Sequence, residues 1–148
     1  MMGREAALGL SRLPGNTPWE SALIQRWITE AGPEFTGFDF NVRVGTVLDP
    51  GPDVPESIRR ASMLNTAKRI DCLAFTSQGV FIVEGKIVAD LTVLGQFMGY
   101  RHILERDRPD LRVLGYILVA HGVTPDTRGF LMAHGVIVNV YPTVVAPA

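Results

Sequence analysis

The stretch from Lys68 to Ile87, KRIDCLAFTSQGVFIVEGKI, is the part of the sequence that decides the fold. Its two halves, Lys68–Phe75 and Val80–Ile87, are rich in apolar and β-branched residues, and the tetrapeptide Thr76–Gly79 separates them. Short apolar runs bounded by turn residues are typical of paired strands. The stretch therefore predicts a β-hairpin.

Two acids and a lysine lie at corresponding places in the two strands. Side chains alternate along a strand, so Glu84 and Lys86 share one face while Gly85 points to the other. If the turn holds an even number of residues and is centred after Ser77, Asp71 lies directly opposite Glu84. Like charges in that position destabilise a sheet. An odd-length turn or a bulge would instead place the two acids on opposite faces.

A divalent cation removes the repulsion, because Mg²⁺ and Mn²⁺ prefer carboxylate oxygens and hold both acids ionised. Such an ion can bind a phosphate oxygen, lower the pKa of an attacking water and stabilise the leaving oxygen. The Lys86 ammonium can orient that water or meet the growing negative charge. Asp71, Glu84 and Lys86 are therefore candidate catalytic residues for cutting phosphodiester bonds.

The flanking sequence predicts the elements around the hairpin. The motif Thr17-Pro18-Trp19-Glu20 combines an N-cap, a first-turn proline and a capping-box glutamate, so a helix is expected to about Ala31. Strict alternation over Phe38–Val44 predicts a strand with one wet face. Further elements are expected as a short helix or ordered excursion over Pro55–Leu64, a helix from about Asp90 to Glu105, a strand buried on both faces over Arg112–Ala120, a helix from Thr124 that Gly135 ends, and a strand over Val136–Tyr141.

This order, a helix, three strands, a helix, a strand, a helix and a strand, predicts an α/β fold. An antiparallel meander followed by helix-linked strands implies a mixed central sheet flanked by helices. We expect one domain over residues 1–148, with a core from about 17 to 141.

Composition narrows the class of protein. With 148 residues, 47% apolar and 20% charged, the chain can bury a real core. We expect a cytoplasmic protein without a membrane partner, because no apolar run is long enough to span a bilayer and the N-terminus lacks a signal-peptide pattern. The single cysteine, Cys72, excludes an internal disulfide and a thiolate zinc site and is expected to be buried.

The net charge of −1 argues against broad electrostatic coating of nucleic acid but leaves room for a local footprint. Basic residues form a cluster in the sequence on each side of the hairpin acids. Either cluster taken alone is equally typical of an ordinary solvent-exposed surface. They are Arg59, Arg60, Lys68 and Arg69 before the acids, and Arg101, Arg106, Arg108 and Arg112 after them.

Asp71, followed after twelve residues by Glu84-Gly85-Lys86, resembles the D…ExK signature of the PD-(D/E)XK nuclease superfamily. The segment Gln96-Phe97-Met98-Gly99-Tyr100 is similar to the QxxxY motif of the RecB and phage-lambda-type exonuclease branch. The expected element order from about 17 to 120 is also similar to the superfamily core. One departure is Ile70, where the family has a proline.

The resemblance implies a restriction-endonuclease-like fold and a site held by several groups. Its metal ligands would be Asp71, Glu84, the Gly85 carbonyl and Glu20, although Glu20 also fits the capping box. Gln96 and Tyr100 would lie on one helix face and reach the site. Two glycines of that helix, Gly95 and Gly99, are expected to allow close packing on the sheet.

The activity that the resemblance implies is that of a Mg²⁺- or Mn²⁺-dependent deoxyribonuclease acting on DNA ends as an exonuclease. One alternative is a structure-selective endonuclease similar to Holliday-junction resolvases, which would act on branched DNA as a homodimer. Another is a non-catalytic nucleic-acid-binding subunit with the same fold.

Overall fold

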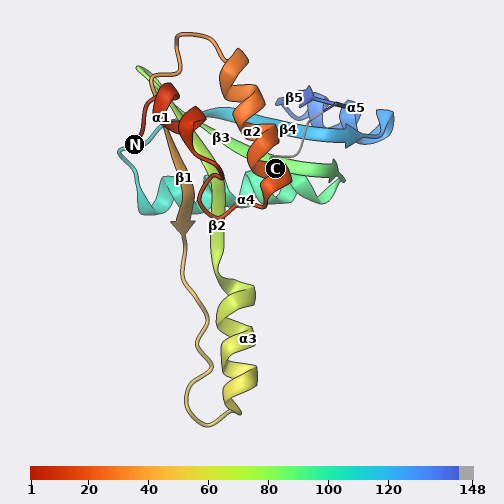
Figure 1. The fold of residues 1–148 in the computed structure, drawn as a ribbon. Coiled ribbons are helices and arrows are strands. Elements are labelled where there is room, and N and C mark those ends of the chain that lie inside the picture. The colour runs from red at the N-terminus through yellow and green to blue at the C-terminus, as the bar shows by residue number, and fades with distance from the viewer. Residues whose placement is uncertain (144–148) are drawn as a thin grey trace.

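The structure is a computed structural model that describes residues 1–143. It is an α/β fold, as expected, with helices on both faces of a five-stranded sheet (Figure 1). In chain order its elements are α1 (Arg4–Gly9), α2 (Pro18–Glu30), β1 (Gly37–Val44), α3 (Glu56–Thr66), β2 (Lys68–Thr76), β3 (Gly79–Ala89), α4 (Thr92–Asp107), β4 (Val113–Val123), α5 (Pro125–Ala133) and β5 (Val136–Val140).

The sheet is mixed and its strands follow chain order, β1-β2-β3-β4-β5. The pairs β1–β2 and β2–β3 are antiparallel, whereas β3–β4 and β4–β5 are parallel and are linked by α4 and α5. Parallel neighbours need such crossover connections, while antiparallel ones can be joined by a tight turn. The expected mixed sheet is therefore confirmed.

Two apolar clusters, one on each face of the sheet, hold these layers together. One face packs on α2 and α1 through Leu23, Ile24, Trp27, Ile28 and Ala7. The other packs on α4 and α5 through Val93, Leu94, Phe97, Leu104 and Leu131. Strand β4 contributes to both clusters, so the prediction of a doubly buried strand is confirmed for its central residues, Ile117 to Ala120.

Helix α2 forms where its N-terminal motif predicts. The Thr17 hydroxyl accepts from the Glu20 N–H at 3.3 Å, and the Glu20 carboxylate accepts from the Thr17 N–H at 3.0 Å. At the other end the Arg4 guanidinium donates to the carbonyls of Ile28, Ala31 and Gly32. A cation beside the last carbonyls of a helix satisfies them and complements the helix dipole. Helix α1, which sequence analysis did not predict, is thereby attached to α2.

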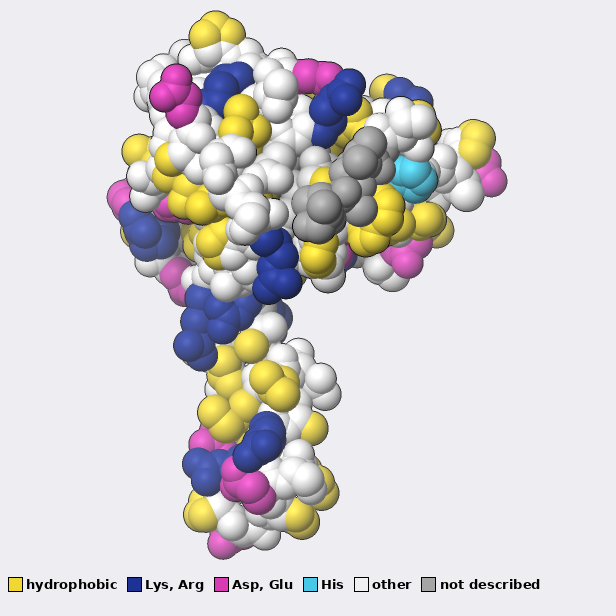
Figure 2. All heavy atoms as spheres, viewed as in Figure 1, with side chains coloured by type: hydrophobic (Ala, Val, Ile, Leu, Met, Phe, Trp, Pro, Cys, Tyr) yellow, Lys and Arg dark blue, Asp and Glu magenta, His cyan; other side chains and the backbone are white. Residues whose placement is uncertain are grey.

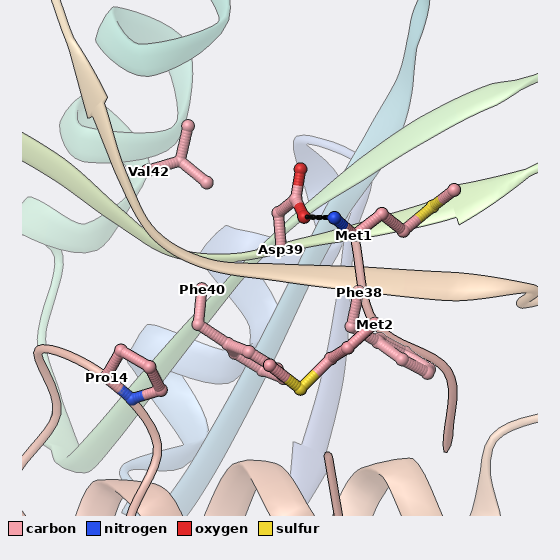
Figure 3. Close-up of a pocket in the computed structure, with 7 residues that line it drawn as sticks. All are labelled: Met1, Met2, Pro14, Phe38, Asp39, Phe40 and Val42. Atoms are coloured by element: carbon pink, nitrogen blue, oxygen red, sulfur yellow. Dashed lines mark ion pairs between the residues drawn. The ribbon is translucent and has the colours of Figure 1, made fainter. Parts of the chain in front are cut away.

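The segment before α1 pairs with the edge strand β1. Met2 and Phe38 exchange two backbone hydrogen bonds, of 2.9 and 2.8 Å, and the Met1 amino group lies 2.8 Å from the Asp39 carboxylate. Figure 3 shows these residues around a cavity of about 330 Å³, which is lined by Met1, Met2, Pro14, Phe38, Asp39, Phe40 and Val42. Pairing of this kind covers part of an otherwise open sheet edge.

The hairpin between β2 and β3 has the predicted register. Its turn consists of Ser77 and Gln78, with Thr76 opposite Gly79, and the pairing continues to Cys72 opposite Val83. The Thr76 hydroxyl fixes the turn, since it donates to the Gly79 carbonyl at 3.1 Å and accepts from the Gln78 N–H at 3.2 Å. Cys72 is buried, as expected.

The alternation predicted for Phe38–Val44 breaks at Asn41. Phe38 and Phe40 pack toward α2, whereas Val42 and Val44 pack toward α4. Asn41 has a φ of 54°, in the left-handed region, and no paired partner in β2. The prediction of one continuous wet face was therefore wrong, because the left-handed residue turns the strand over.

Beyond this break, the chain between β1 and β2 projects away from the body. Figure 1 shows α3 and the segment before it as a long extension, and Figure 2 shows it as a separate lobe on a narrow base. Helix α3 has no buried residue. The region predicted as a short helix or ordered excursion is thus a helix, and α1 and α3 are both additional to the order of elements that we expected.

Within residues 1–143, no helix has the length and apolar character that crossing a membrane would need.

The two glycines of α4 do not have the role that was expected of them. Gly95 and Gly99 are exposed, and a Cβ at either position would meet no atom within 4 Å. The prediction that they allow close packing on the sheet was wrong.

Replacement of either glycine by alanine should stabilise the protein. Gly95→Ala and Gly99→Ala are each expected to raise the free energy of unfolding by about 1 kcal/mol, because alanine has the better helix propensity and meets no clash. Gly85→Ala serves as the contrasting variant and should lower it, since a Cβ there would lie 3.1 Å from the Ile24 side chain. Urea denaturation measures all three, and a loss of stability at position 95 or 99 would mean that this helix face is covered.

Candidate functional site

Asp71 and Glu84 face each other where β2 and β3 part. The last pair between these strands is Cys72 with Val83. Past it, β2 continues beside β1 as far as Lys68, while β3 continues beside β4 as far as Ala89. The acids are the first residues beyond the last pair, so both lie at the mouth of the opening between the strands.

Each acid bonds the backbone of the opposite strand. The Asp71 N–H donates to Glu84 Oε1 at 3.3 Å, and the Gly85 N–H donates to Asp71 Oδ2 at 3.0 Å. These bonds replace the ladder bonds that end at the opening, and buried backbone donors need such partners. The sequence-based expectation that Asp71 and Glu84 come together is therefore confirmed, whereas their role stays a prediction.

Burial sets the electrostatics of this acid pair. Glu84 is only 2% exposed and Asp71 is half-buried. Loss of hydration raises the pKa of both carboxyls, and for Glu84 the neighbouring Asp71 charge raises it further. Two adjacent carboxyls in a poorly hydrated site resist double ionisation. The pair therefore needs either a shared proton or a cation.

Lys86 and Tyr100 lie within electrostatic reach of the acid pair. The Lys86 charge acts to lower the pKa of both acids. Tyr100 is half-buried against the α4-side core, and burial, followed by the charges of Glu84 and Asp71, raises its pKa to about 12. Both residues are thus placed beside the site.

For the other predicted site residues, Gln96, Glu20 and Gly85, the link to the acid pair is weaker. Gln96 is half-buried on the same helix as Tyr100, but within residues 1–143 its side chain forms no hydrogen bond with the acids. Glu20 is held by the capping box, although its charge also acts to raise the pKa of Asp71. Gly85 lies under α2, where a Cβ would be 3.5 Å from the Glu20 carbonyl oxygen.

The donor set suits a hard divalent cation only in part. Two carboxylates converge, and carboxylate oxygen is the ligand that Mg²⁺ and Mn²⁺ prefer. In the described part of the chain, however, no group of three or more His, Cys, Asp or Glu residues is arranged to hold a metal. A cation here would be held by Asp71 and Glu84, and water or substrate oxygens would complete its coordination.

Two residues near the site were not predicted from the sequence. Arg43 lies directly opposite Arg69 in the β1–β2 pair, which only the register between these strands reveals. Asn41, which lies unpaired between the pairs Phe40–Cys72 and Val42–Ile70, turns β1 over at the level of Asp71. His121 instead bonds the Tyr141 carbonyl and lines a cavity of about 250 Å³ to which neither acid contributes.

No family model and no curated protein matches the sequence. Among solved structures it is similar to the crystal structure of a protein of unknown function, AF1548, with a TM-score of 0.46 and 12% sequence identity. That match covers 82% of this chain and 57% of the other, so this chain spans little more than half the length of that protein.

The acid pair predicts an unusual pH dependence of stability without metal. The pKa of Glu84 rises on folding from 4.5 to about 9, so between these values the folded protein holds a proton that the unfolded chain has released. Stability from this group is therefore complete below about pH 4.5 and is lost as the pH rises toward 9. Unfolding in EDTA, followed at stepped pH, should show a loss that Glu84→Gln removes.

The control is Glu5→Gln, which removes an exposed glutamate of α1 and should keep the wild-type profile. The same profile in Glu84→Gln as in the wild type would contradict the raised pKa.

Proposed function

We propose that this protein is a metal-dependent nuclease that hydrolyses DNA phosphodiester bonds, with Asp71 and Glu84 as ligands of Mg²⁺ or Mn²⁺. The observation that carries the proposal is the pair of carboxyls at the opening between β2 and β3, Glu84 buried and Asp71 half-buried, with Lys86 next to them. A purely structural sheet gains nothing from adjacent acids that resist ionisation. A bound cation makes the same arrangement favourable.

The residues around the acids have distinct tasks in this proposal. The bound cation would polarise the phosphate and lower the pKa of a water molecule. Lys86 would orient the water and stabilise negative charge on the phosphate, because its ammonium already acts on both acids. Tyr100, protonated at neutral pH because its pKa is about 12, would donate a hydrogen bond to a phosphate oxygen.

The substrate preference follows from the resemblance of Gln96 and Tyr100 to the QxxxY motif, which favours action at DNA ends. A structure with the same superfamily fold would place both residues on the helix after the catalytic strand, and here both lie on α4 directly after β3. The proposal is therefore exonuclease-like processing of DNA ends.

A second candidate function is a non-catalytic nucleic-acid-binding subunit. The observation that favours it is the limited set of acids, since Glu20 bonds its own helix start and no third acid joins the pair within residues 1–143. The two candidates differ in whether metal binding leads to cleavage.

Cleavage assays test the first candidate. The protein is incubated with linear, circular and branched DNA in Mg²⁺ or Mn²⁺, and loss of linear DNA alone would indicate an exonuclease. Lys86→Ala and Glu84→Gln are each expected to lower the cleavage rate by about 100-fold or more, because each removes charge from the reacting centre. Equal cleavage by wild type and both variants would rule out this site.

The matched control is Arg128→Ala, which removes an exposed cation of α5 and should cut DNA at the wild-type rate.

Metal binding can be tested without any substrate. At a concentration about 100 times the dissociation constant, Mg²⁺ or Mn²⁺ should stabilise the fold by about 2.7 kcal/mol, seen as a rise in Tm. The double variant Asp71→Asn, Glu84→Gln should show no rise. A rise without any cleavage would support the non-catalytic candidate, and no rise in the wild type would contradict the metal site.

A further inference from the structure

The projecting lobe has hydrogen bonds of its own and is joined to the body at its base, where the Gly45 N–H donates to the Asp107 carboxylate at 3.2 Å. We define the arm as residues 45–67, the loop after β1 together with α3. The Ser62 hydroxyl donates to the Leu48 carbonyl at 3.0 Å, and the Leu48 N–H donates to the Thr66 hydroxyl at 2.8 Å. The loop is thus fastened to its own helix, while α3 buries no residue. A helix that buries no residue gains little stability from packing within the protein, so we look for a role in binding another molecule.

Three cations lie where the arm joins the body. We define the neck as Arg43, Lys68 and Arg69, all of which are exposed. Arg43 is the direct cross-strand partner of Arg69, and Lys68 is the partner of Val44. Figure 2 shows Lys and Arg side chains gathered at this narrow base. The neck therefore concentrates positive charge on a protein whose net charge is −1.

The neck cations differ from the other cations of this region. Within the arm, Arg59 lies 2.8 Å from the Asp49 carboxylate and Arg60 lies 3.7 Å from that of Glu56. In the part of the chain that the structure describes, no neck cation forms an ion pair, and the Lys68 ammonium bonds only the Thr66 carbonyl. Like charges directly opposed across strands are destabilising. An external anion would remove this conflict.

The position of the neck points to the chemistry of that anion. Arg69 and Asp71 are two residues apart on β2, about 7 Å along the strand. A phosphate chain whose scissile bond lies at the acid pair would pass the neck within the reach of arginine and lysine side chains. Guanidinium groups bind phosphate through two parallel hydrogen bonds, and such contacts do not depend on base sequence.

We propose that the neck and the arm form a grip on the sugar-phosphate backbone of a nucleic acid, with the neck cations bound to phosphates beside the acid pair. The arm extends along the backbone beyond the neck. This proposal rests on the proposed function for the position of the cut, but the grip itself needs neither a metal nor cleavage.

Binding in EDTA tests the grip apart from catalysis. The affinity of the wild type and of the double variant Arg43→Ala, Arg69→Ala for labelled single-stranded and duplex DNA is measured by fluorescence anisotropy over a range of salt concentrations. The double variant should bind at least about tenfold more weakly at low salt. Its slope of log affinity against log salt should fall by about 1.4 on single strands and about 1.8 on duplexes, because two phosphate contacts are lost.

Two further variants keep the outcome clear. Arg43→Lys with Arg69→Lys preserves the charge and should keep the wild-type salt slope, whereas Arg128→Ala removes an exposed cation of α5 and should change nothing. Unchanged affinity and slope in the double alanine variant, with an unchanged Tm, would overturn the grip.

The result also separates the grip from the nuclease. If the wild type cuts no DNA but its binding depends on the neck, the proposed cleavage fails and the grip stands. If Glu84-dependent cleavage is seen while the neck variants bind and cut like the wild type, the grip fails and the nuclease stands. Ile58 and Leu64 are exposed apolar residues of α3, and the double variant Ile58→Ser, Leu64→Ser tests whether the arm binds a second copy of the chain. If the wild type forms a concentration-dependent dimer that this variant loses, and if DNA binding does not depend on the neck, the arm is a dimer contact and the grip is overturned.

Discussion

Two carboxyls that share the opening between β2 and β3 constrain the rest of this structure. The strands pair as an ordinary hairpin up to Cys72 and Val83 and then take different partners. Such a parting leaves backbone donors without ladder partners, and here the side chains of Asp71 and Glu84 satisfy them across the gap. The same contact brings two acids together in a site from which water is largely excluded. Local hydrogen bonding is thus satisfied at the expense of an electrostatic conflict.

The helices on both faces of the sheet pack close to the acid pair. Helix α2 packs on β3 at Gly85, while α4 brings the Tyr100 ring to the opposite face, the one to which Glu84 points. Burial is the main cause of the raised pKa of each acid. The arm leads into β2, where the neck residues Lys68 and Arg69 come shortly before Asp71. Strand β2 therefore links part of the neck to one of the two acids.

Local patterns predicted the hairpin well, because its register depends on a turn whose residues are adjacent in the sequence. The Thr76 hydroxyl bonds both sides of that turn, and counting outward from it places Asp71 opposite Glu84. The start of α2 was predictable for the same reason, since Thr17 and Glu20 cap each other over three residues.

The features that were missed depend on contacts between distant parts of the chain. Helix α1 is held at the end of α2 by Arg4, and no local sequence pattern predicts that contact. The turn of β1 at Asn41 could not be anticipated, because Phe38 to Val44 alternates regularly in sequence and only the structure shows the left-handed backbone. The helical periodicity around Gly95 and Gly99 also did not indicate which face of the helix would be covered by the sheet.

The close approach of α2 to Gly85 has a consequence for how this segment can vary. Any side chain at that position would press on Ile24, and either that side chain or the helix would have to shift away from the strand that carries Glu84. The triplet Glu84-Gly85-Lys86 is therefore restricted by lack of space in its middle, and the function that we propose would also restrict the charged residues at its two ends. Substitutions at Glu84 or Lys86 would remove charge from the site without creating a clash, whereas a substitution at Gly85 would disturb the packing of α2 whatever the function of the protein.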